Sequence, residues 1–153
     1  MSGRILCVDF GERRLGVALS DPGGMIASPF TTLPRRKGKR PPIADLIAIM
    51  DAQEVVEIVV GLPLTLAGDD SEWTTAVRSF AETLSTRSGR PVTLVDERFS
   101  SIVAERAVRA SGLKKTQREE KERVDAAAAA VILQSYLNTR SRHPRAERAD
   151  HES

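Results

Sequence analysis

Cysteine and histidine are nearly absent from this sequence of 153 residues. The one cysteine, Cys7, excludes a disulfide within the chain and any zinc site built from several cysteines. The two histidines, His143 and His151, both lie in a polar C-terminal stretch. We therefore expect neither a histidine metal site nor a Ser-His catalytic triad.

Aromatic residues and long apolar runs are also scarce. Aromatics make up 4% of the residues, so the core must consist mainly of Val, Ile, Leu and Ala, and few rings remain for stacking on bases. The longest unbroken apolar run, Ala126–Leu133, is far too short to cross a bilayer. The first apolar run contains Asp9, which is not typical of a signal peptide. We therefore expect a cytoplasmic protein that has no membrane partner.

Hydrophobic and charged residues are present in ordinary amounts, at 41% and 29%, and predict a globular domain. The net charge of +2 is too small to indicate a nucleic-acid partner by itself. The basic residues are clustered, however: Arg35–Arg40 holds five in six positions, and residues 114–123 mix five basic with three acidic side chains. Each cluster alone is equally consistent with a solvated loop. Two clusters beside a carboxylate site would indicate phosphate binding.

The apolar pattern predicts an α/β domain. Three strands joined by short turns come first and predict an antiparallel meander, in which Pro29 favours an edge position for the third strand. Two more strands alternate with helices, and such crossovers imply parallel pairing. The predicted fold is a mixed five-stranded sheet flanked by helices over residues 1–138, followed by a polar tail, 139–153, that we expect to be disordered. The predicted strands are Arg4–Phe10, Leu15–Leu19, Met25–Leu33, Val55–Leu62 and Val92–Glu97. One predicted helix follows Pro41-Pro42, and three more span Asp69–Ser85, Ser100–Ala110 and Val124–Leu137.

Acidic residues interrupt or end two of the predicted strands. Asp9 shares a strand face with Ile5 and Cys7, where a carboxylate is costly unless it is paired or binds a metal. Asp96 and Glu97 end the fifth strand, at the sheet edge where sites gather in open α/β folds. These two point to opposite faces, so only one can join Asp9, and we favour the longer Glu97. The simpler alternative is that these residues form turns or lead into a helix.

A third acidic position lies on the last predicted helix. Asp125 shares the apolar stripe of that helix with Ala128, Ala129 and Ile132. The small alanines would let the helix approach the sheet closely. The alternative is an aspartate that only interacts favourably with the helix dipole at the N-terminal end of the helix. Glu122, one turn earlier, could be a fourth ligand or an exposed loop residue.

Three carboxylates on three separate elements match the hard oxygen ligands of Mg²⁺ or Mn²⁺. Two such ions about 3.5–4 Å apart activate water and stabilise the leaving oxygen in phosphodiester cleavage. Competing motifs fail: Gly11–Gly16 has the spacing of a Walker A loop, but Val17 and Ala18 stand where Lys and Ser/Thr are required. The loop Gly61–Gly68 is equally consistent with a phosphate-facing loop and a plain turn. We therefore favour Asp9, Glu97 and Asp125 as the catalytic and metal-binding set.

Four segments along the chain form a recognisable set: Asp9–Asp21 (DFGERRLGVALSD), Val60–Leu64 (VGLPL) with Gly68, Asp96–Ser101 (DERFSS) and Val124–Ala129 (VDAAAA). In order and with suitable spacing, over about residues 4–138, they resemble the motifs of the YqgF/RuvX family. The resemblance implies a ribonuclease H-like fold related to Holliday junction resolvases, and a nuclease that matures the 5′ end of pre-16S ribosomal RNA. It also implies an acidic site at Asp9, Glu97 and Asp125, with Asp69 or Asp70 as the alternative to Glu97.

Together these features predict a metal-dependent endonuclease that acts on structured nucleic acid. A precursor of ribosomal RNA is the first choice of substrate and a four-way DNA junction the second, which would need two active sites and hence a homodimer. The alternatives are a non-catalytic RNA-binding or ribosome-associated protein and an ATPase of the actin and sugar-kinase type, which normally needs two such domains. The predicted substrate-binding residues are Arg14, Arg35, Arg36, Lys37, Lys39, Arg40, Arg98, Lys114 and Lys115.

Overall fold

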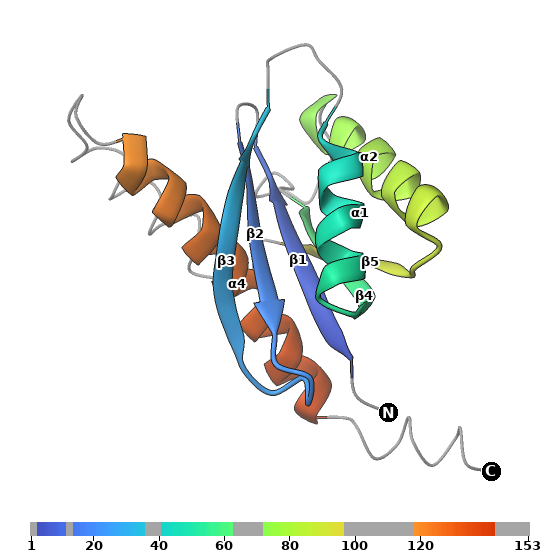
Figure 1. Ribbon diagram of the computed structural model, residues 1–153, viewed down its shortest axis with the longest axis vertical. Helices are drawn as coiled ribbons and strands as arrows, with labels where there is room; N and C mark the ends of the chain where they lie inside the picture. Colours follow the sequence, from blue (N-terminus) through green and yellow to red (C-terminus); the bar gives the residue numbers. More distant parts are fainter. Residues whose placement is uncertain (1–2, 12–13, 36–40, 63–71, 97–117, 143–153) are drawn as a thin grey trace.

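The computed structural model describes residues 3–11, 14–35, 41–62, 72–96 and 118–142 (Figure 1). The predicted helix Ser100–Ala110, the loop after Gly61-Leu62 and the tail 143–153 lie outside the described residues. The strands are β1 (Arg4–Phe10), β2 (Arg14–Ser20), β3 (Ala27–Pro34), β4 (Val55–Leu62) and β5 (Val92–Asp96). The helices within the described residues are α1 (Ile43–Ala52), α2 (Glu72–Ser88) and α4 (Arg118–Arg142).

The strands form one mixed sheet in the order β3-β2-β1-β4-β5. The pairs β1–β2 and β2–β3 are antiparallel, whereas β1–β4 and β4–β5 are parallel. This arrangement confirms the predicted meander and the predicted parallel crossovers. The strand that contains Pro29 lies at one edge, as expected for a residue that has no backbone N–H to donate.

The two faces of the sheet carry separate apolar cores. Side chains alternate along each strand, so β1 sends Leu6 and Val8 to one face and Ile5 and Cys7 to the other. Helices α1 and α2 cover the first face, and α4 covers the second (Figure 1). Residues 5–10 of β1 are consequently all buried.

Helix α4 is longer than the predicted segment Val124–Leu137 at both ends. Tertiary contacts hold its C-terminal turns, since Arg140 pairs with Glu57 of β4 at 2.7 Å and Tyr136 donates a hydrogen bond to the same carboxylate. Burial and this carboxylate raise the pKa of Tyr136 above its usual value, so the phenol stays a donor. Residues 139–142, which we expected to begin a disordered tail, are instead the end of this helix, and Arg140 connects them to β4.

The other helix boundaries follow local signals. Helix α2 runs on to Ser88, beyond the predicted end at Ser85, because the stop signal is Gly89, which has a φ of +70° and donates from its N–H to the carbonyl of Ser85. Helix α1 follows Pro41-Pro42, as predicted, and its buried residues Ile43, Leu46 and Met50 recur at spacings of three and four. No helix in the described part of the chain combines the length and hydropathy that a membrane crossing requires.

Candidate functional site

Asp9 is the buried acidic residue of β1, with 5% of its surface exposed. It alternates with Val8 and Phe10, which belong to the core under α1 and α2, so it lies on the α4 face together with Cys7. In the antiparallel ladder its partner on β2 is Gly16. The carboxylate therefore lies on a covered face of the sheet, near the carboxyl end of β1.

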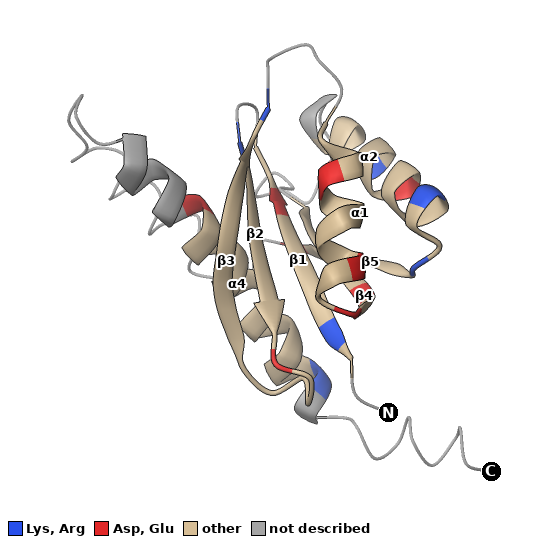
Figure 2. Cartoon of the chain, in the orientation of Figure 1, with Lys and Arg blue, Asp and Glu red and all other residues tan. Residues whose placement is uncertain are grey.

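Gly16 lets α4 approach the sheet at this point. A Cβ atom at position 16 would overlap the carbonyl oxygen of Asp125 and would come within 3.1 Å of the N atom of Ala126. The neighbouring helix residues Ala126 and Ala129 are also buried, which confirms the prediction that small residues permit a close approach. Gly16 thus has two acidic neighbours: Asp9 is its partner in the β1–β2 ladder, and the backbone of Asp125 packs against it. Figure 2 shows the acidic positions of β1 and α4 at a similar level along the sheet.

Asp125 pairs with Arg14. The Nε atom of Arg14 donates a hydrogen bond of 2.9 Å to Oδ2 of Asp125, and the two side chains are 26% and 28% exposed. Arg14 begins β2 and has the same strand parity as Gly16, so it also lies on the α4 face. The sequence suggested Arg14 only as a residue that contacts substrate; its ion pair with a residue 111 positions away was not predicted.

The third acidic position is only partly described. Asp96 pairs with Leu62 at the end of β5 and alternates with Val95, which packs against the core under α4. Asp96 therefore lies on the opposite face from Asp9, a placement that the sequence had left open when it predicted only that Asp96 and Glu97 point to opposite faces. The favoured Glu97 and the alternatives Asp69 and Asp70 lie outside the described residues, as does the side chain of Glu122. Within the described ranges, no three acidic, histidine or cysteine side chains form a metal-binding group, so the full set stays a prediction.

Asp9 and Asp125, the two acidic residues next to Gly16, carry oxygen donors of the kind that a hard divalent cation prefers. A carboxylate as buried as Asp9 is stable only where positive charge or hydrogen bonds compensate it. Oxygen donors on two rigid elements, a central strand and a helix, match the ligands that Mg²⁺ and Mn²⁺ prefer. Because Asp125 keeps about a quarter of its side chain exposed, a ligand could approach this pair from solvent.

Arg35 is more firmly attached than its place in a basic loop suggested. Its guanidinium lies 4.4 Å from the centroid of the Phe10 ring and donates to the carbonyl of Gly11 at 3.1 Å. Phe10 in turn stacks on Phe80 of α2, at 4.4 Å between ring centroids. Arg35 thus connects the beginning of the basic segment to the core. The other predicted substrate-binding residues lie outside the described residues: Arg36, Lys37, Lys39, Arg40, Arg98, Lys114 and Lys115.

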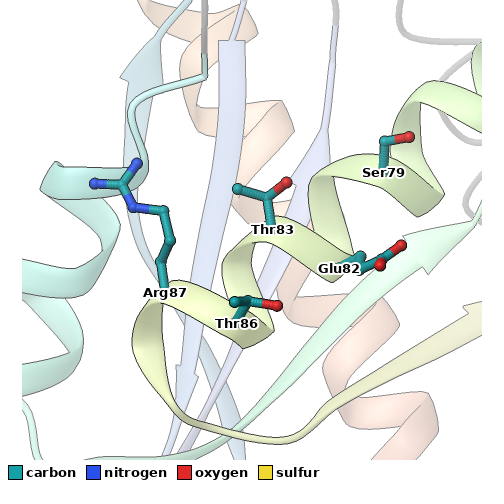
Figure 3. A pocket seen from close by; sticks show the side chains of 5 residues that line it. All are labelled: Ser79, Glu82, Thr83, Thr86 and Arg87. Carbon is teal, nitrogen blue, oxygen red and sulfur yellow. The ribbon is translucent and has the colours of Figure 1, made fainter.

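Two hollows on the other side of the sheet were not predicted. A cavity of about 680 Å³ lies between the start of α1 and α2, with Phe10 and Phe80 among its lining residues. A smaller hollow of about 310 Å³ lies on the outer surface of α2 (Figure 3). Ser79, Thr83 and Arg87 line both hollows. Neither hollow includes Asp9, Arg14 or Asp125 among its described lining residues.

The sequence of this chain is similar to those of known proteins. A family model described as "RuvX: Holliday junction resolvase" matches residues 3–139. A Koribacter versatilis protein named "Putative pre-16S rRNA nuclease" is 46% identical over 90% of this chain and 88% of its own length. A Chloroflexus aurantiacus protein of the same name is 41% identical over 92% of this chain and 90% of its own length.

The fold is also found among solved structures. Thermus thermophilus RuvC in complex with a Holliday junction substrate superposes with a TM-score of 0.54, at 15% identity, over 90% of this chain and 96% of RuvC. This likeness confirms the ribonuclease H-like fold. Because the family model spans nearly the whole chain and the relatives exceed 40% identity, the protein belongs to the RuvX family of nucleases.

Proposed function

We propose that this chain is a metal-dependent endonuclease that cleaves phosphodiester bonds in structured nucleic acid. The observation that carries the proposal is the convergence of Asp9 and Asp125 on one glycine: two carboxylates from a buried strand and a closely packed helix lie on the same covered face. Rigid elements hold catalytic groups more precisely than loops do. The family names support the same reaction class.

Asp9 and Asp125 would hold one or two divalent ions, with Glu97 as the third ligand. When bound, such ions activate water and stabilise the leaving oxygen of the scissile phosphodiester. The contribution of Asp9 is a fixed oxygen donor in a position that excludes most of the solvent. Asp125 contributes a donor whose backbone is fixed on Gly16 and whose carboxylate faces the guanidinium of Arg14.

The preferred substrate is a precursor of 16S ribosomal RNA, cut in the maturation of its 5′ end. The names of relatives that span nine tenths of this chain favour it. A four-way DNA junction is the second candidate, favoured by the description of the family model. Chemistry at the phosphodiester does not distinguish the two, since it does not involve the base. Contacts to the phosphate backbone would come from the clustered basic residues 35–40 together with Arg14, Arg98, Lys114 and Lys115.

The decisive experiment is cleavage of labelled pre-16S RNA and of a labelled four-way junction, each in Mg²⁺, Mn²⁺ or EDTA. Asp9→Asn and Asp125→Asn test the carboxylates. Asp51→Asn is the matched control, because Asp51 is an exposed aspartate of α1 that pairs with Arg90. We expect metal-dependent cleavage of the RNA by the wild type and the control, and none by the two site variants.

Other outcomes would decide between the remaining interpretations. Cleavage of the junction alone would favour a resolvase, and its active form would then be a homodimer with two sites. Binding of either nucleic acid with no cleavage under any condition would contradict the enzyme and favour a ribosome-associated binding protein. Equal cleavage by the wild type and Asp9→Asn would show that the catalytic centre lies elsewhere.

A further inference from the structure

The ion pair between Arg14 and Asp125 is a single-point contact. Nε of Arg14 meets Oδ2 of Asp125 at 2.9 Å, and this is the one hydrogen bond that either side chain makes among the described residues. An arginine in a fork arrangement would instead bind both carboxylate oxygens through two parallel N–H groups. The observed contact leaves most donors of the guanidinium available, so the pair can separate without breaking a wider network.

Main-chain packing fixes both ends of this pair. The carbonyl of Arg14 accepts a 3.0 Å hydrogen bond from the N–H of Gly11 in the turn between β1 and β2, and a Cβ at Gly11 would lie only 2.6 Å from that carbonyl oxygen. The backbone of Asp125 rests on Gly16, two residues further along β2. The two charges are therefore held together by the fold itself, and only their side chains are free to rearrange.

A divalent cation and the guanidinium would compete for Asp125. A metal ligated by Asp125 would share its carboxylate with Nε of Arg14, and two cations so close repel each other. Arginine stays protonated at any relevant pH, so it cannot relieve the repulsion by losing its charge. Because the two side chains are 26% and 28% exposed, the ion pair is open to solvent on one side and a dissolved divalent cation can reach the carboxylate.

We propose that Arg14 is an exchangeable counter-ion: it neutralises Asp125 until a divalent cation binds, and its guanidinium then moves to a phosphate of the nucleic acid. This inference rests on the proposed function, because it needs Asp125 to be a metal ligand. Arg14 lies two residues from Gly16, the strand partner of Asp9, and has the same strand parity, so the released guanidinium stays on the face of the sheet that carries the candidate site. A planar guanidinium is well suited to a phosphate group, and it would make tight nucleic-acid binding depend on bound metal.

The first test measures Mn²⁺ binding to the protein alone, by calorimetry, without nucleic acid. Arg14→Gln should bind Mn²⁺ about two- to fivefold more tightly than the wild type, because the competing cation is gone. Arg14→Lys should stay near the wild type, since it keeps the charge. The matched control is Arg140→Gln, which breaks a second ion pair that the described residues of α4 make, with Glu57, and should leave Mn²⁺ binding unchanged.

The second test uses the wild-type chain, so it does not depend on how the variants fold. The Nε–H resonance of Arg14 in a ¹⁵N spectrum should shift during a Mg²⁺ titration, whereas that of Arg140 should not. In filter binding of labelled RNA, checked to be intact on a gel, the wild type and Arg14→Gln should bind equally in EDTA. In Mg²⁺ the wild type should bind more tightly, and its salt slope should be steeper by about 0.7–0.9 for the added phosphate contact.

Asp125→Asn separates the two hypotheses. If this variant binds Mn²⁺ as well as the wild type does, the proposed metal site is wrong. If it loses Mn²⁺ while Arg14→Gln matches the wild type and the Arg14 resonance does not move, the metal site stands and the counter-ion role is overturned. Equal loss of RNA affinity by Arg14→Gln in EDTA and in Mg²⁺ would contradict the exchange and would make Arg14 a permanent phosphate contact.

Discussion

Asp9 lies directly opposite Gly16 in the β1–β2 ladder, and the backbone of Asp125 rests on that same glycine. The two carboxylates are 116 positions apart in the chain (125 minus 9), yet one missing Cβ atom is what allows their elements to meet. The site therefore depends on the packing of α4 against β2 as much as on the acidic residues themselves.

Gly16→Ala should move α4 away from the sheet. The added Cβ would overlap backbone atoms of residue 125, which cannot rotate away as a flexible side chain could. We expect a loss of about 1–3 kcal/mol in the free energy of unfolding, the range for overpacked interiors, and a larger proportional loss of cleavage because Asp125 is displaced. Chemical denaturation and single-turnover cleavage measure the two effects. Wild-type stability and rate in this variant would show that α4 does not need this contact.

Asp9→Asn should abolish cleavage and leave the fold intact. The two side chains are nearly isosteric, but the amide lacks the negative charge that a metal ligand needs. Because burying a charged carboxylate costs free energy, its replacement by a neutral amide should lower the free energy of unfolding only a little or even raise it. Circular dichroism and thermal unfolding check the fold, and cleavage in Mn²⁺ checks the chemistry. A variant that unfolds would indicate a structural role for Asp9 instead.

We expect Arg35 to stabilise the fold and the basic residues that follow it, in positions 36–40, to bind nucleic acid. Replacing Arg36, Lys37, Lys39 and Arg40 with Ser should weaken nucleic-acid binding about equally across sequences and lower the salt slope by about 0.7–0.9 for each phosphate that is no longer bound. Turnover at saturating substrate should change little. Arg35→Ser should instead cost about 0.5–1 kcal/mol of stability, because it removes the cation from the face of Phe10. Unchanged affinity in the four-site variant would make the segment only a solubilising surface and would leave Lys114 and Lys115 as the next candidates.

Asp21 should make the turn between β2 and β3 sensitive to acid. The N–H groups of Ile26 and Met25 donate to its carboxylate, at 2.9 and 2.7 Å, and lower its pKa below the usual 3.8. A lowered folded-state pKa means that the stabilisation is present above the unfolded pKa and is lost as the pH falls through the folded pKa. Asp21→Asn should therefore lose less stability than the wild type between pH 5 and about pH 2. Urea unfolding across this range measures the difference, and parallel pH profiles would contradict the prediction.

Much of the fold could be predicted from local patterns. Strands β1 and β4 begin and end at the predicted residues, because apolar runs bounded by Gly, Pro or charged residues are clear local signals. The parallel and antiparallel pairings followed from the lengths of the connections. The length of α4 could not be predicted from local patterns. Its last turns are polar and are held by Glu57 of β4, a contact across 83 positions that periodicity does not reveal.

In the candidate site too, some features follow from local sequence patterns and others from tertiary contacts alone. By itself the sequence determined which residues carry charge and on which face of an element each must lie, because the periods of strand and helix set that parity. Asp9 among apolar neighbours and Asp125 on an apolar stripe were both recognisable from it. Only the tertiary structure decided that these two meet at Gly16 and that Arg14 pairs with Asp125. The physical reason is that the distance between α4 and β2 depends on a missing side chain in one element and the backbone of another, and no local pattern relates two such segments.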